Sequence, residues 1–254
     1  MIALTRMAAA AACALSLSAP AALAFDLSAM TAEERDAFGA AVRSYLLENP
    51  EVILEAVDVL EDQQASAEAA RDDALVAASL QELQDDGYSW VGGNPDGDIT
   101  LVEFMDYRCG YCRRAAPEIE TLLAQDPNIR LVVKEFPILG EASVLSSRFA
   151  IATKLEAGDA AYKEVHDTLM AYTSEPNEVA LRRMAEGLSL DADAILARMD
   201  SADVTEQLQR TRALAQQLSI SGTPTFVLED EMLRGFLPAD QLQLMIEEIR
   251  AARS

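Results

Sequence analysis

The fold is decided by residues 99–112, which read ITLVEFMDYRCGYC. Residues 99–105 form an apolar run typical of a buried strand. Cys109 and Cys112 follow it, and residues 109 to about 125 have helical periodicity that we expect Pro117 to interrupt. The pattern is therefore a strand, a Cys-x-x-Cys pair and a helix, an order that favours redox exchange between thiols and disulfides.

Two other uses of the cysteine pair fit less well. A structural zinc site needs four ligands, and beyond this pair the chain offers only His166 and the early Cys13. A structural disulfide between Cys109 and Cys112 would close a very small loop and constrain little of the unfolded chain. We predict that His166 has a surface or packing role, and that the methionines are core residues rather than copper ligands.

The position of the pair also favours an ionised thiol. A cysteine at a helix N-terminus faces unpaired N–H groups and the positive end of the helix dipole, and both stabilise the thiolate. Arg108, Arg113 and Arg114 add positive charge nearby. We therefore predict that Cys109 is the exposed nucleophile and Cys112 the buried resolving thiol.

Two charged residues on the expected strands are further candidates. Glu103 lies six residues before Cys109, and Lys134 lies on the next strand. A buried carboxylate beneath the cysteines can take the proton of the resolving thiol. The alternatives are that Glu103 is simply a strand residue with its hydrogen bonds satisfied and that Lys134 forms a surface salt bridge.

The rest of the region from residue 87 onward alternates between strands and helices. We expect a domain boundary at residues 87–98, strands at 129–136, 220–229 and 232–236, and a closing helix at 238–252. Residues 140 to about 218 are helical throughout, with breaks near Gly158, Pro176 and Gly187. A β-α-β half, a helical insertion and a β-β-α half are therefore expected to share one sheet, which makes the fold class α/β.

The first residues have the features of a secretory signal. Arg6 precedes an apolar run, and the Ala22-Leu23-Ala24 segment fits a cleavage site, so we expect residues 1–24 to be removed. Cys13 is lost with them. Removal of Arg6 takes the net charge from −23 to −24. We expect the product to be soluble and exported to the periplasm.

Residues 25–86 are acidic and helical in pattern. Thr31 and Glu34 form a capping box, and Asn49-Pro50 begins a second helix that neither glycine nor proline interrupts up to about residue 86. A heptad seam carries large side chains only as far as Leu60. We predict an oligomerisation segment at 25–60 and a helical spacer at 61–86. The alternative is a helix packed on its own catalytic domain.

Composition excludes some partners. Half of the 254 residues are hydrophobic and 25% are charged, as in a folded protein. The 20 basic and 43 acidic residues give a net charge of −23, which would repel nucleic acids and anionic membranes.

Three motifs carry a family resemblance. LVEFMDYRCGYC, VVKEFP and GTPTFVL resemble the thioredoxin-fold thiol–disulfide interchange proteins of the bacterial periplasm, the DsbA and DsbC families. YLLENPEVILEAVDVLE resembles the N-terminal oligomerisation segment of the ScsC (suppressor of copper sensitivity) group. The resemblance implies a thioredoxin fold with a DsbA-like helical insertion. It also implies a cis Pro224 facing Cys109, and a Thr223 backbone that pairs with an extended substrate. Glu103 matches the buried acid of the family, and Lys134 matches more loosely.

The residues between the cysteines bear on the direction of the reaction. DsbA-type oxidases resemble Cys-Pro-His-Cys, whereas this chain has Gly110 and Tyr111 between its cysteines, where they would contact the substrate with Thr223 and Pro224. Without that histidine the pair should be less oxidising, with a potential between roughly −200 and −120 mV. We predict a disulfide isomerase or reductase, trimeric by resemblance. It would act on misfolded or wrongly bonded exported proteins and be kept reduced by a membrane reductase of the DsbD or ScsB type.

Other functions remain open. The chain could be a DsbA-like dithiol oxidase, a copper-tolerance protein that binds Cu(I) at the reduced cysteines, or a tethering module. We expect no cofactor beyond the redox-active Cys109–Cys112 disulfide, and no resident metal.

Overall fold

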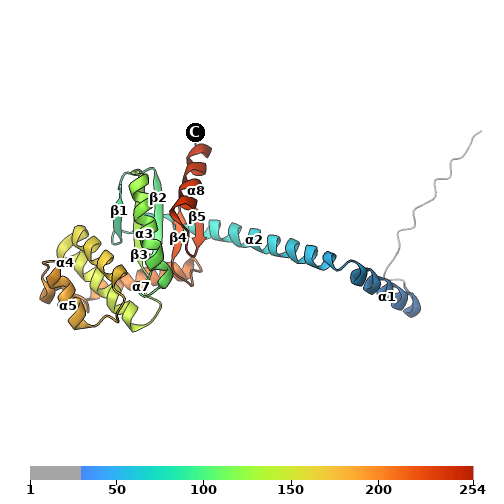
Figure 1. Ribbon diagram of the computed structural model, residues 1–254, viewed down its shortest axis with the longest axis horizontal. Helices are drawn as coiled ribbons and strands as arrows, with labels where there is room; N and C mark the ends of the chain where they lie inside the picture. The colour runs from blue at the N-terminus through green and yellow to red at the C-terminus, as the bar shows by residue number, and fades with distance from the viewer. Residues whose placement is uncertain (1–29, 254) are drawn as a thin grey trace, which may run out of the picture. The chain divides into compact units, whose positions relative to one another are not determined.

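The computed structural model describes residues 30–253 (Figure 1). The predicted signal segment, with Cys13, lies outside these residues. The chain divides into two compact units, Met1–Glu61 and Asp62–Ser254. No helix among the described residues is both long and apolar enough to cross a membrane.

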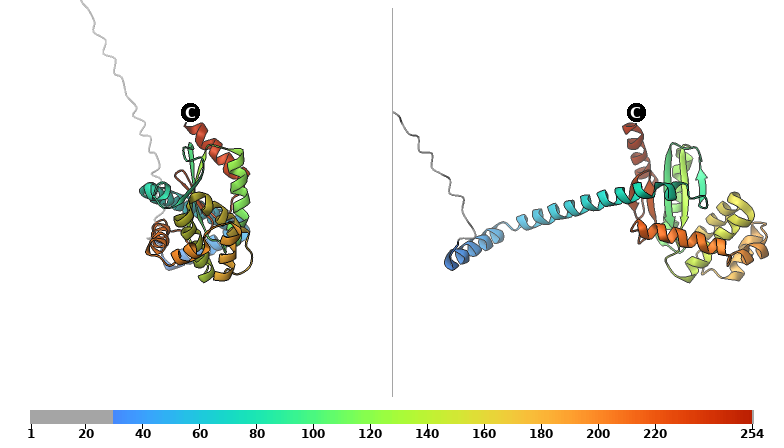
Figure 2. Two further views of the ribbon diagram at one scale, coloured as in Figure 1. Left: turned by 90° about the vertical axis from the view of Figure 1, so that its left-hand side faces the viewer. Right: turned by 180° about the vertical axis from the view of Figure 1, so that it is seen from behind.

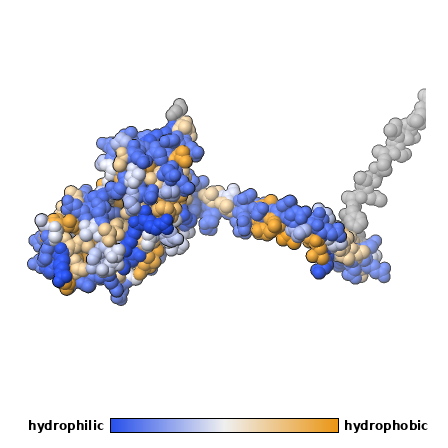
Figure 3. All heavy atoms as spheres, viewed as in Figure 1, coloured by the Kyte–Doolittle hydropathy of each residue, from blue (hydrophilic) through white to orange (hydrophobic). Residues whose placement is uncertain are grey.

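The described part of the first unit contains α1 (Ala32–Glu48) and the start of α2 (Glu51–Gln84). The predicted capping box begins α1. The Thr31 hydroxyl accepts from the Glu34 amide at 3.2 Å, and Glu34 accepts from the Thr31 amide at 2.8 Å. No residue of α1 is buried. Apolar side chains are instead exposed on the surface of this unit (Figure 3), among them Phe38, Val42, Tyr45, Leu47, Ile53, Leu54, Val57, Val59 and Leu60.

The end of α2 belongs to the second unit. Val76 and Leu83 are fully buried there, and Asp72 pairs with Arg234 at 2.8 Å. Residues 72, 76, 79 and 83 repeat at helical spacing and form the buried stripe. The structure thus differs from the predicted spacer at 61–86, because this half of the helix packs within the second unit and the boundary between the two units follows Glu61.

The second unit is built on a five-stranded sheet in the order β1-β3-β2-β4-β5. Its strands are β1 (Trp90–Gly93), β2 (Ile99–Met105), β3 (Ile129–Glu135), β4 (Thr225–Leu228) and β5 (Glu231–Arg234). β2 and β3 are parallel, and the other neighbours are antiparallel. β1 was not predicted, since its glycines indicated a linker. Gly93 has a positive φ of 64° and comes close to the Ile129 carbonyl, so an added Cβ would clash there.

Helices cover both faces of the sheet (Figures 1 and 2). Leu101 and Val133 face a core that includes α3 (Gly110–Gln125) and α8 (Ala239–Ala252). Val102 and Val132 face the other core, with α2 and α7 (Ala202–Gln217). Because side chains alternate along a strand, adjacent residues of β2 and β3 point into different cores.

The insertion between β3 and β4 is helical, as predicted. It comprises α4 (Glu141–Ala171), α5 (Glu178–Gly187), α6 (Ala192–Arg198) and α7. Gly158 has a φ of 85° and kinks α4, and α5 begins just after Pro176, so the expected breaks are confirmed. Pro117 differs from the prediction, since α3 continues through it.

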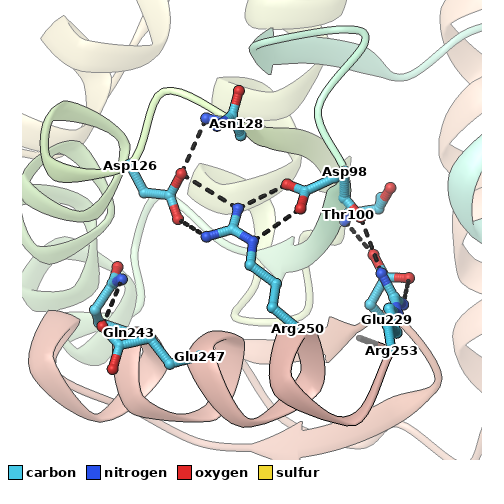
Figure 4. Close-up of polar contacts among 9 residues, drawn as sticks. All are labelled: Asp98, Thr100, Asp126, Asn128, Glu229, Gln243, Glu247, Arg250 and Arg253. Carbon is cyan, nitrogen blue, oxygen red and sulfur yellow. Dashed lines mark hydrogen bonds and ion pairs between the residues drawn. The ribbon is translucent and has the colours of Figure 1, made fainter.

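Arg250 of α8 fixes the two elements that carry the site (Figure 4). Its guanidinium binds Asp98, just before β2, at 2.6 Å and Asp126, at the end of α3, at 2.5 Å. Hydrogen bonds from Arg250 lower the pKa of both aspartates. The base of β2 and the C-terminus of α3 are thereby held to α8.

Candidate active site

The two cysteines lie at the N-terminus of α3. Cys109 is the N-cap residue, with an extended backbone, and Cys112 lies in the first turn. Both thiols are free, and the Cys109 amide donates to the Asp106 carbonyl at 3.0 Å. Cys109 keeps 7% of its surface exposed, whereas Cys112 is fully buried. The predicted order of accessibility holds, although Cys109 is less exposed than expected.

The loop before β4 faces the first thiol. The peptide bond between Thr223 and Pro224 is cis, as the resemblance implied. The Cys109 Sγ lies 3.1 Å from the Thr223 carbonyl oxygen, to which it donates. The Cys109 thiol and the loop expected to bind substrate are therefore in direct contact.

Asp106 fixes the approach to the cysteines and was missed in the sequence. Its Oδ1 accepts from the Arg108 amide at 2.7 Å, and its Oδ2 accepts from the amides of Ile138 and Leu139 at 2.8 and 3.1 Å. The loop after β2 is thus held to the segment after β3. An aspartate directly after a strand often accepts local amide bonds in this way, and that pattern could have indicated it.

The three arginines lie around the start of α3. Arg113 donates to the Tyr107 carbonyl at 2.9 Å and to the Tyr172 carbonyl, and Arg108 donates to the Ser174 carbonyl at 2.9 Å. These bonds join the site to the end of the α4 region. Arg114 instead lies over the Phe236 ring, 4.8 Å from its centroid.

Glu103 lies beneath the pair, as predicted. It is 3% exposed, and one carboxyl oxygen is buried without a hydrogen-bond partner. Burial, with a contribution from Glu135, raises its pKa to about 8. Burial also raises the pKa of the Cys112 thiol, and the charge of Glu103 raises it further. The charge of Glu103 and that of the Cys112 thiol therefore disfavour each other.

Lys134 does not belong to this site, which corrects the predicted catalytic role. Its side chain is fully buried on the other face of the sheet, where Nζ binds Asp86 Oδ2 at 2.6 Å and the Glu82 carbonyl at 2.7 Å. The residue in register with Glu103 is Val133, so the next residue along β3 points away from the cysteines. The alternative prediction was a surface salt bridge of Lys134. A salt bridge is observed, but the Lys134–Asp86 pair is buried.

Glu135, which the sequence analysis did not single out, lies on the cysteine side of β3. Its Oε1 accepts hydrogen bonds from the hydroxyls of Tyr107 at 2.7 Å and Tyr162 at 2.6 Å. Burial raises its pKa to about 7. Glu135 lies within VVKEFP, directly after Lys134. An acid at that place in a predicted buried strand is the signal that could have indicated it.

His166 has the packing role that was predicted. It is 8% exposed, stacks on Tyr162 with ring centroids 5.8 Å apart, and its Nδ1 lies 3.1 Å from the Tyr107 hydroxyl. Burial lowers its pKa to about 4, so the ring is neutral at pH 7.

A hollow of about 500 Å³ opens beside the loop that Asp106 holds. Residues of the β3–α4 segment, α4 and α7 line it, among them Pro137, Ile138, Val144, Leu145, Arg148 and Arg212.

Between the cysteines, Gly110 has open space around its Cα, and Tyr111 is 58% exposed. Within residues 30–253, no group of three or more His, Cys, Asp and Glu side chains is placed to hold a metal.

The fold and the site together define a class, the thiol–disulfide oxidoreductases of the thioredoxin fold. The DSBA-like thioredoxin domain model matches residues 100–247, and the Copper resistance protein ScsC N-terminal domain model matches residues 34–67. The chain therefore belongs to the DSBA-like thioredoxin family and carries an ScsC-type N-terminal domain, as the resemblance indicated.

Solved structures agree with this assignment. A thioredoxin-like oxidoreductase from Silicibacter pomeroyi DSS-3 is 40% identical, with a TM-score of 0.63 over 67% of this chain and 97% of that one. A linker-deletion mutant of Proteus mirabilis ScsC is 26% identical, with a TM-score of 0.67 over 89% of this chain and all of that one (100%).

Among curated proteins, the chain is 30% identical over 174 residues to a Na(+)/H(+) antiporter NhaA protein of Salinispora tropica. The match covers 66% of this chain but only 26% of the antiporter, so the chain spans about a quarter of the length of that relative.

Proposed function

We propose that this protein is a periplasmic disulfide isomerase or reductase that acts on exported proteins through Cys109 and Cys112. The observation that carries the proposal is the placement of Cys109. Its thiol lies at the N-terminus of α3, only 3.1 Å from the Thr223 carbonyl in the loop where an extended client would pair. No other cofactor is required, because the two thiols themselves carry the electrons.

The first step is attack by the Cys109 thiolate on a client disulfide. The sulfur bonds to one client sulfur, and the other client sulfur leaves as a thiolate and takes a proton from water.

The second step closes the cycle in one of two ways. Cys112 loses its proton to Glu103 and attacks Cys109, which forms the Cys109–Cys112 disulfide and releases a reduced client. Alternatively a client thiol attacks the mixed disulfide, which regenerates Cys109 and leaves the client with a rearranged bond. The first outcome is reduction, and the second is isomerisation.

Isomerase activity is supported by the residues between the cysteines and by the first unit. Gly110 and Tyr111 provide no positive charge to stabilise a thiolate further. The exposed apolar side chains of α1 and early α2 form a surface that self-association would bury. We propose a trimer, which would present several sites to one bound client. Its reduced state would be restored by a membrane reductase of the DsbD or ScsB type.

The direct test is reactivation of scrambled ribonuclease by the mature chain, residues 25–254. An isomerase restores activity, whereas an oxidase acts well only on the reduced substrate. Sedimentation should show an oligomer. The Val42→Glu variant, which places a charge on the exposed apolar surface of α1, should dissociate it.

The matched comparison is a chain that lacks residues 25–61, cut at the boundary between the two units so that the buried half of α2 remains. It should lose isomerisation but keep oxidation of dithiols. Equal shuffling by the truncated chain would refute the role of the first unit, and activity that survives Cys109→Ser would refute the proposed chemistry.

A further inference from the structure

Glu135 is a buried acid that the exchange reaction proposed above does not use. It is 6% exposed, and its Oε1 accepts the two tyrosine hydroxyls while its Oε2 is buried without a partner. Burying a carboxyl group with an unsatisfied oxygen is costly, and a packing role alone would be met by an apolar residue. Glu135 is therefore a buried acid whose cost packing alone does not explain.

Glu103 lies close to Glu135 on the same face of the sheet. β2 and β3 are parallel, with Glu103 opposite Val133 and Met105 opposite Glu135, so the two acids are diagonal neighbours. Each has one buried carboxyl oxygen without a partner. Two carboxylates so placed repel each other, and their protons are bound by the pair rather than by either group alone.

The surroundings favour a single negative charge on this pair. The titratable groups that face Glu135 are Glu103 from β2, Asp106 and Tyr107 from the following loop, Tyr162 from α4, and His166 from α4 through Tyr107. The two tyrosines donate to a charged Glu135 and so stabilise it. Glu103, in contrast, accepts no hydrogen bond at its unsatisfied oxygen.

Glu135 also borders a small cavity. A cavity of about 10 Å³, enough for about one water molecule, lies against Glu135 and Tyr162. Lys154, whose side chain is 21% exposed, lines the same cavity. The cavity therefore has room for a water molecule beside Glu135.

We propose that Glu103 and Glu135 share one proton, and that Glu135 thereby sets the pH at which Glu103 can take the proton of Cys112. While the pair carries a single negative charge and that charge is on Glu135, Glu103 stays protonated and cannot accept. When Glu135 holds the proton, or when both acids have lost theirs, Glu103 is a carboxylate. It then receives the Cys112 proton, the thiolate attacks Cys109 of the mixed disulfide, and the client leaves as a thiolate that is protonated by water. Glu135 is thus a positioning residue, and the inference rests on the proposed exchange reaction.

The test separates the two chemical steps. The reduced mature chain is mixed with a labelled peptide disulfide between about pH 5 and about pH 9, quenched rapidly and followed by mass spectrometry. The first phase is formation of the mixed disulfide at Cys109, and the second is its resolution by Cys112. For Glu135→Gln we expect the acidic limb in the pH profile of the second-phase rate to move to lower pH by about one unit. At any pH below the limb, resolution of the mixed disulfide should then be roughly tenfold faster. The first phase should not change.

Two further variants guard against a folding defect. Tyr162→Phe keeps the ring stack on Trp90 but removes a hydrogen bond that stabilises ionised Glu135. It should move the limb in the same direction by a smaller amount. Glu103→Gln should lower the pH at which Glu135 titrates, read from the infrared band of its protonated carboxyl, because the coupling is mutual.

The outcomes distinguish failure of the proposed exchange reaction from failure of the shared proton. If no mixed disulfide forms, the proposed function fails. If it forms normally but Glu135→Gln and Tyr162→Phe leave the limb of the second phase in place, the shared proton is refuted. Slowing of both phases together would assign Glu135 to packing alone, and would also overturn the proposal.

Discussion

The two faces of the sheet treat buried charge in opposite ways, and two consecutive residues of β3 show it. Lys134 points toward α2 and is matched by Asp86 at 2.6 Å, with both side chains nearly or fully buried. Burial lowers the pKa of Lys134, while the nearby Asp86 charge opposes that effect. On this face, each buried charge has a partner of opposite sign.

The other face buries charges of the same sign. Glu103 and Glu135 lie there with the two thiols, and burial raises the pKa of both acids, to about 8 and about 7. Such groups change protonation near neutral pH, whereas a matched pair stays ionised over a wide range. One face therefore holds a buried pair of matched charges, and the other holds two buried acids that change protonation near neutral pH.

The largest expected effect is loss of exchange when the sulfur on the reactive face is removed. Cys109→Ser should reduce exchange to the uncatalysed background, a loss of at least about a thousandfold, because Cys109 is the partly exposed thiol that contacts the Thr223 carbonyl and Cys112 is fully buried. Peptide disulfide reduction measures it. Cys112→Ser is the matched control, since it should still attack but accumulate the mixed disulfide. If Cys112→Ser fails to trap a client, the assigned order of the two thiols is wrong.

The second prediction breaks the matched face. Lys134→Met should lower the free energy of unfolding by about 3–5 kcal/mol, because it leaves Asp86 buried without its counter-charge. Urea unfolding measures the loss. The exchange rate of the folded fraction should stay the same, because Lys134 lies on the face away from the cysteines.

A double variant tests the cause of that loss. Asp86→Asn keeps an acceptor for the amides of Tyr88 and Ser89, which bind Asp86 Oδ1 at 2.9 and 2.8 Å. Combined with Lys134→Met, it should recover part of the stability, because the unpaired charge is gone. A fall in exchange rate without a fall in stability would mean that Lys134 takes part in the exchange reaction after all.

The third prediction uses pH on the unmatched face. The pKa of Glu103 rises from its usual 4.5 to about 8 in the folded protein, so the folded state holds a proton that the unfolded chain releases. Stability should therefore fall as pH rises from about 4.5 to about 8. Glu103→Gln should remove this loss, on the order of 3 kcal/mol, and leave a smaller slope from Glu135. Urea midpoints across the window measure it, and an unchanged slope would contradict a buried, protonated Glu103.

The same comparison explains which site residues the sequence could predict. Glu103 and the cysteines lie on one continuous strand and helix, where spacing fixes the side of the sheet. Lys134 lies on a different strand, and its face depends on the register between β2 and β3, which the sequence does not state. Glu135 was missed for the same reason, because a register shift of one residue would exchange the faces to which Lys134 and Glu135 point.

The elements of the fold also differ in whether local sequence patterns predict them. Strong local patterns predicted β2, β3, the helical insertion and the capping box of α1. β1 was hidden because Gly92 and Gly93 weaken a strand pattern, and only its pairing with β3 reveals it. The second half of α2 looked like a free helix because its buried stripe contains Asp72 and Ser79, polar residues that are satisfied only by partners distant in sequence, Arg234 and Gln217.

The smallest expected effect comes from a matched cluster nearer to solvent. Arg250 is 29% exposed and Asp98 is 53% exposed, so water already stabilises much of their charge. Asp126 is only 6% exposed, but it keeps the Asn128 amide as a hydrogen-bond donor at 3.0 Å when the arginine is lost. Arg250→Met should cost only about 1 kcal/mol, and added salt should reduce the difference, unlike that for Lys134→Met. Hydrogen bonds from Arg250 lower the pKa of Asp98 and Asp126 below their usual 3.8, so the contribution of the cluster is present above that pH and is lost as pH falls through the lowered values. Urea unfolding at neutral and at acidic pH measures both effects. A loss as large as that for Lys134→Met would mean that charge matching, rather than burial, decides the stability of these pairs.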